Sequence, residues 1–154
     1  MNGYDMTTTS YSFTNKPLTL THVHTSGSKN LTEVHTYSYD YADRLLKVQH
    51  KLDGDTIVTL AEYTYDDLGR MEQKKLGGTA HSSTYSYNIR SWLTGITGSK
   101  FTQTLAYNNS TAGYNGNITA MGWTADGDSH SYTFTYDGLS RLLNATPVSY
   151  THLR

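Results

Sequence analysis

The stretch that decides the fold is Tyr63–Met71, YTYDDLGRM, because degraded copies of it recur along the chain. Side chains on a β-strand alternate between the two faces, so the two tyrosines share one face. Asp66 and Gly69 then favour a turn, since aspartate bonds to nearby backbone and glycine accepts a positive φ. The stretch therefore predicts a strand ending in Tyr-x-Tyr, a turn, and a second strand that restarts at Arg70.

Further copies follow at steps of 20 to 29 residues, measured between their second aromatic residues. Three of them keep the plan well, at 37–46, 85–93 and 134–143. Two are weaker: 11–18, which contains Tyr11-Ser-Phe13, and 105–118, where the restart is delayed. Steps of this size are typical of stacked-repeat proteins. Turn signals between the copies, such as Gly27 and Asp53-Gly54, predict that each period is one hairpin.

The positions that recur define a structural repeat motif. Its members are Tyr37, Tyr39, Asp40, Arg44, Tyr63, Tyr65, Asp66, Gly69, Arg70, Tyr85, Tyr87, Asn88, Tyr107, Asn108, Phe134, Tyr136, Asp137 and Arg141. Because asparagine replaces the aspartate in two copies, this position is predicted to cap the turn, since an acid or base must titrate. The arginines are predicted to pair with a motif aspartate or a loop carbonyl.

The motif Tyr-x-Tyr-Asp-x-x-Gly-Arg resembles the tyrosine-aspartate (YD) repeat of the Rhs family, which includes teneurins and the shell subunits of insecticidal toxin complexes. The resemblance covers Tyr11 to Leu143. It implies tandem antiparallel β-hairpins, stacked side by side into a continuous curved sheet that is part of a hollow shell. The residues by themselves also indicate an all-β fold, because tyrosine and threonine are abundant and no helical spacing is sustained.

Residues 1–147 are assigned to this repeat region, with about six degenerate hairpins. Residues 148–154 depart from the repeat and are similar to translated adaptor sequence. We therefore treat them as a non-native tail and exclude them from the fold prediction. The Asp-Pro-x-Gly signature and the variable toxin domain that follow the repeats in bacterial members do not occur in this sequence. The chain thus resembles the casing without its cargo.

The resemblance implies a non-catalytic structural segment of a secreted or cell-surface bacterial protein. Its partners would be the remaining YD repeats and core of the same protein, and its role would be to enclose or present a C-terminal toxin or effector domain. The alternative is a carbohydrate-binding or adhesion module, in which tyrosines such as Tyr132 and Tyr136 stack on glycans.

Composition excludes several other classes. Twelve Lys and Arg against thirteen Asp and Glu give a net charge of −1, which does not favour a nucleic-acid partner. The chain has no cysteine and therefore no disulfide. It has no apolar run near the ~18 residues that a transmembrane helix needs. Residues 1–10 lack the basic and apolar regions of a signal peptide.

No catalytic, metal or cofactor site is predicted. His22 and His24 share a strand face and His35 lies across a turn from them, but no carboxylate or cysteine joins at ligand spacing, so a polar sheet face is preferred. His50, with His81 and His130, is predicted in or beside turns. The Asp-Gly-Asp pieces at 53–55 and 126–128 lack the oxygen ligands of a calcium loop and are interpreted as hairpin turns.

Overall fold

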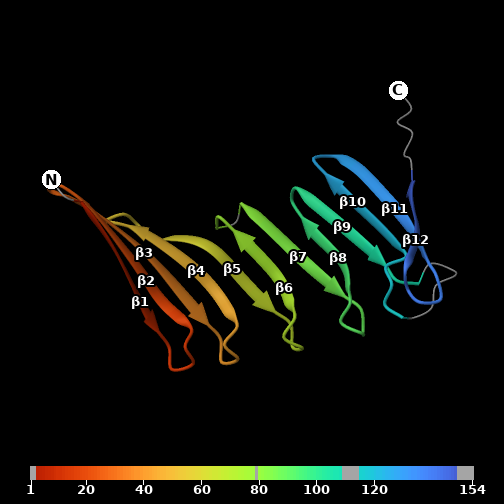
Figure 1. Ribbon diagram of the computed structural model, residues 1–154, viewed down its shortest axis with the longest axis horizontal. Helices are drawn as coiled ribbons and strands as arrows, with labels where there is room; N and C mark the ends of the chain where they lie inside the picture. Colours follow the sequence, from red (N-terminus) through yellow and green to blue (C-terminus); the bar gives the residue numbers. More distant parts are fainter. Residues whose placement is uncertain (1–2, 79, 109–114, 149–154) are drawn as a thin grey trace. The chain divides into compact units, whose positions relative to one another are not determined.

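The computed structural model describes residues 3–78, 80–108 and 115–148, and within them it contains strands and turns but no helix (Figure 1). The chain divides into two compact units, 1–82 and 83–154. The strands are β1 Tyr4–Tyr11, β2 Pro17–Ser26, β3 Lys29–Tyr39, β4 Leu45–Leu52, β5 Val58–Tyr65, β6 Met71–Leu76, β7 His81–Tyr87, β8 Leu93–Gly98, β9 Phe101–Ala106, β10 Ala120–Ala125, β11 Asp128–Tyr136 and β12 Leu142–Val148.

Both units are antiparallel meanders in which each strand pairs with the next one along the chain. The first unit orders its strands β1 to β6. The second orders them β7 to β12, with β7 entering it at Ser83. The expectation of an all-β fold made of tandem antiparallel hairpins stacked side by side is confirmed.

The two faces of each sheet differ in chemistry because the side chains alternate. On β11, rings occupy one face with His130, Tyr132, Phe134 and Tyr136, while the intervening residues 129, 131, 133 and 135 are serine or threonine. The cross-strand register carries this division to β10, since Met121 lies opposite Tyr132. The aromatic side chains of β10 and β11 therefore lie on one face of the sheet, with small and hydroxyl side chains on the other.

Neither unit closes a core. Among the described residues only Ala61 and Thr119 are buried, at 6% and 5% exposure, and no large side chain is fully buried. The strand residues are mostly half-exposed, as expected for a single layer of sheet. Ladder hydrogen bonds and half-buried cross-strand pairs must therefore supply the stability that a sealed apolar core supplies in other small domains.

A β-bulge precedes the turn in five copies of the motif. The register shifts at Ser38/Tyr39, Thr64/Tyr65, Ser86/Tyr87 and Thr135/Tyr136, and also at Ser10/Tyr11. The alignment that the sequence predicts for the first copy is therefore wrong by two residues. Tyr11, not Phe13, occupies the position of the second aromatic, and Phe13 lies in the turn with its side chain fully exposed. The error arose because Tyr-x-Phe reads as a strand pair when only alternation is considered.

The end of the chain is described as far as Val148. Val148 and Pro147 lie opposite Ser131 and Tyr132 of β11, as part of β12. The remainder of the predicted tail, residues 149–154, lies outside the described residues. Within the part of the chain that the structure describes, no helix reaches the length and hydropathy that a membrane span requires.

Candidate functional site

The turn after each Tyr-x-Tyr is built on the side chain of its first residue. Asp66 Oδ1 accepts hydrogen bonds from the backbone N–H groups of Leu68 at 3.0 Å and Arg70 at 2.9 Å. Asp66 Oδ2 accepts one from Arg70 Nε at 2.7 Å. Gly69 N–H donates to the Asp66 carbonyl, and Gly69 itself has φ of +80°. One carboxylate thus satisfies the orphan donors of the turn and fixes the arginine.

The same arrangement recurs in the other copies. Asp40 binds the backbone of residues 42 and 44 and the Arg44 side chain, and Asp137 does the same with residues 139 and 141. Asn88 keeps the two backbone bonds, to Arg90 and Trp92. The position before the restart has positive φ throughout, in Asn15, Asp43, Gly69, Ser91 and Ser140. Asn108 precedes residues that lie outside the described ranges.

In four copies the second aromatic of the motif ties its hairpin to the one before it. Tyr65 Oη donates to the Leu45 carbonyl at 2.9 Å, and Leu45 is the first residue after the preceding turn. We call these hydrogen bonds the tyrosine staples. The others join Tyr39 to Pro17 at 3.0 Å, Tyr107 to Leu93 at 2.7 Å and Tyr136 to Ile118 at 2.8 Å. Each staple satisfies a phenolic hydroxyl and a backbone carbonyl that lies at the start of a strand or, for Ile118, just before it.

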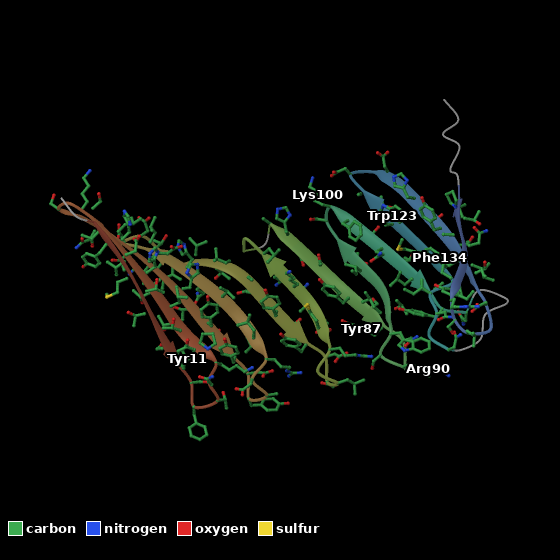
Figure 2. The ribbon with its side chains drawn as sticks, in the orientation of Figure 1. Tyr11, Tyr87, Arg90, Lys100, Trp123 and Phe134 are labelled. Carbon is green, nitrogen blue, oxygen red and sulfur yellow. The ribbon has the colours of Figure 1, made fainter. Side chains whose placement is uncertain are left out.

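The last residue of one turn also packs on the tyrosine of the next hairpin. The Arg44 guanidinium carbon lies 4.7 Å from the centre of the Tyr65 ring, within range of a cation–π contact. In the copy at 85–93 the corresponding residue is Trp92, whose ring lies 5.0 Å from that of Tyr107. Arg90, labelled in Figure 2, lies over Trp92 at 5.2 Å. A cation–π contact in one copy is therefore replaced by a contact between two aromatic rings in another, at the same position.

The turn bonds lower the pKa of the motif aspartates. For Asp66, desolvation raises the pKa, but the hydrogen bonds from the Arg70 backbone and side chain outweigh it and hold the pKa below its ordinary value. Asp40 follows the same balance with Arg44. For Asp137 the backbone bond from Arg141 is the largest cause and also lowers the pKa. The motif aspartates are therefore ionised at neutral pH.

These shifts predict that the fold weakens in acid. A carboxyl whose pKa is lower in the folded state stabilises that state above its unfolded value, and the contribution is lost as the pH falls through the folded pKa. We expect the melting temperature, followed by far-ultraviolet circular dichroism, to drop from about pH 5 downward. Asp66→Asn keeps the Oδ1 bonds and should flatten this drop. Asp67→Asn, which changes the neighbouring carboxyl, should not. Equal slopes in all three proteins would contradict the assignment.

The histidines weighed as ligands fall into two groups, and the structure adds a carboxylate to each. His24 Nδ1 bonds to Asp5 of β1, with His22 Nε2 3.6 Å from the same carboxylate oxygen. Glu33 lies beside His35 and His50. Sequence reasoning missed Asp5 because strand register, which decides cross-strand neighbours, is not visible in the sequence. Glu33 stands two residues before His35 on the same strand, so alternation alone could have found this pair. Only the addition of His50 depends on register.

Two histidines were misplaced by the turn prediction. His50 lies inside β4, directly opposite His35, because the strand continues to Leu52 before the turn begins. His130 lies in β11 and stacks on Trp123 at 5.2 Å. At the Asp-Gly-Asp piece 53–55, Asp53 Oδ1 accepts the N–H of Thr32 in β3 at 2.6 Å, and this bond extends the pairing of β3 with β4.

Among the solved structures that share this fold are two that contain TcdB2-TccC3. The crystal structure of TcdB2-TccC3-Cdc42 matches with a TM-score of 0.59 at 19% identity, over 88% of this chain and 9% of that chain. TcdB2-TccC3 without its hypervariable C-terminal region matches with a TM-score of 0.62 at 18% identity, over the same shares. No protein-family model and no curated protein matches the sequence. The chain thus spans about a tenth of the structures that it resembles.

Proposed function

We propose that the chain is a non-catalytic structural segment of an Rhs-like shell protein. The observation that carries this proposal is that the side chains of the motif bond to the backbone of the repeats themselves. Asp66 and its equivalents are committed to their own turns, and Tyr65 and its equivalents are committed to the preceding hairpin. Residues that recur in this way hold one repeat against the next, which is the requirement of a long stacked sheet.

The shell would enclose or present a C-terminal toxin or effector domain. The likeness to TcdB2-TccC3, one structure of which is described as lacking a hypervariable C-terminal region, supports this reading. The partners would be the neighbouring YD repeats and core of the same protein, because a sheet with free edges pairs with further strands. We further propose that the parent protein is bacterial and is secreted or displayed at the cell surface.

Enclosure predicts protection from proteases. In the full-length protein that carries these repeats, the region C-terminal to them should resist limited proteolysis, followed by mass spectrometry, until the shell is unfolded. Tyr65→Ala, which removes a staple, should speed cleavage of that region. Tyr41→Ala, at a turn residue that is 98% exposed, should leave the cleavage rate unchanged. Cleavage that is equally fast in the intact and unfolded protein would overturn enclosure.

A second candidate, carbohydrate binding, is favoured by one feature of the aromatic face. The rings of Trp123 and Tyr132 are parallel to within 1°, with their centres 5.9 Å apart, and the Phe134 ring lies 6.3 Å from that of Tyr132 at an angle of 12°. Figure 2 labels Trp123 and Phe134 on β10 and β11. Parallel, partly exposed rings are the type of surface on which a sugar ring stacks. The hydroxyl of Tyr136 is not available for this purpose because it forms a staple.

A glycan array decides between the two candidates. Saturable binding of the full chain to a defined glycan, lost in both Trp123→Ala and Tyr132→Ala, would establish a binding module. The matched control is Tyr85→Ala, which removes a tyrosine from β7, away from the Trp123 row. The absence of binding across a broad array would leave the structural segment as the function.

A further inference from the structure

Three ligand-type side chains meet on one face of the hairpin formed by β3 and β4. Glu33 and His35 are two residues apart on β3 and therefore point to the same face. His50 on β4 is the direct cross-strand partner of His35. One ligand atom from each lies within 4.8 Å of the other two. We call these three residues the Glu33 triad.

The distances within the Glu33 triad suit a small divalent cation. Glu33 Oε1 lies 3.0 Å from His50 Nε2 and 3.8 Å from His35 Nε2. Zinc binds imidazole nitrogen and carboxylate oxygen at about 2.0–2.2 Å, so two ligands of a tetrahedral ion lie about 3.3–3.5 Å apart. The two measured distances fall on either side of that separation. Small side-chain rotations would bring all three atoms onto one ion.

The environment of His50 is a second, independent observation. Its Nε2 atom has almost no contact with solvent and forms no hydrogen bond, although the Glu33 carboxylate is 3.0 Å away. A buried polar atom is normally satisfied, and the exceptions call for an explanation such as an ion. The His50 imidazole and the Glu33 carboxylate are close enough for a hydrogen bond but are not oriented to form one. A cation between the imidazole lone pair and the carboxylate would satisfy both groups.

We propose that the Glu33 triad binds a zinc-class divalent cation through two imidazoles and one carboxylate. Zinc sites with three protein ligands keep a fourth position for water or another donor. The ion joins both arms of the hairpin that the Asp40 turn closes, so it stabilises this part of the sheet by binding only its folded form.

Calorimetric titration of the untagged full chain with zinc chloride near neutral pH tests the site. We expect one ion per chain and a rise in melting temperature. Glu33→Gln and His50→Gln should each weaken binding by roughly 100-fold. Loss of a residue that only supports a ligand weakens a metal site by about 10- to 100-fold, and loss of a direct ligand should cost no less. His24→Gln is the matched control: it removes a histidine of the neighbouring Asp5 group and should leave the affinity unchanged.

Two results would overturn the site. One is the absence of zinc binding by the native chain. The other is binding that survives Glu33→Gln and His50→Gln but is lost in His24→Gln, which would assign the ion to Asp5 and its histidines. Nitrogen-15 spectra of the native protein cover the case in which a variant fails to fold: zinc should shift the Nε2 signals of His35 and His50, and unshifted signals count against the proposal.

Discussion

Tyr65→Ala should lower the free energy of unfolding by about 2–4 kcal/mol. The substitution removes the staple to the Leu45 carbonyl, the contact of the ring with the Arg44 guanidinium, and the cross-strand contact with Met71. Desolvation, the largest cause, raises the pKa of Tyr65, which indicates a partly enclosed hydroxyl. With no sealed core to compensate, one lost link between hairpins is a large share of the stability of this sheet. Urea unfolding followed by far-ultraviolet circular dichroism measures the change.

Tyr65→Phe separates the staple from the packing. It keeps the ring and deletes only the hydroxyl, so the expected loss is about 0.5–1.5 kcal/mol. Tyr41→Ala, at an exposed turn position, should change stability by less than about 0.5 kcal/mol. If Tyr65→Ala costs no more than Tyr41→Ala, the tyrosines do not connect the repeats, and the structural role proposed for the motif fails with them.

The sequence predicts the turns of the repeat because the contacts that form each turn lie within five consecutive residues. Asp66 reaches Leu68 and Arg70 two and four positions along the chain, so the spacing of the motif contains the turn. Alternation then predicts that Tyr63 and Tyr65 share a face. From these two rules the hairpins, their order and their antiparallel pairing follow.

The staples depend instead on register. The acceptor of each staple is a backbone carbonyl 14 to 22 residues earlier, and a carbonyl carries no residue identity to recognise. The bulge before Tyr65 also shifts the pairing by one position, which alternation alone does not anticipate. The meeting of Glu33 with His50 has the same origin, since it requires the register of β3 on β4. The pattern of side chains thus predicts the strands and turns, whereas the contacts between strands depend on how the strands pair.

Gly69→Val should destabilise the chain by about 2–3 kcal/mol. Gly69 has φ of +80°, and a Cβ atom there would lie 3.0 Å from Arg44 Nη1. A β-branched side chain is strongly disfavoured at positive φ. The change also disturbs the arginine that packs on Tyr65. Thermal and urea unfolding of the variant measure the loss.

Gly69→Asn is the informative comparison. Asn15 already occupies the equivalent position of the first turn at φ of +62°, and Asp43 occupies it in the second at +58°. Asparagine tolerates this conformation, so the expected loss is below about 1 kcal/mol. Leu68→Val, one residue earlier in the same exposed turn, controls for β-branching. If valine and asparagine at position 69 were equally stable, positive φ would not be what this position selects. The requirement for positive φ is what explains why glycine, aspartate, serine and asparagine replace one another at this position of the five turns. Without that requirement, the common turn geometry would have no basis.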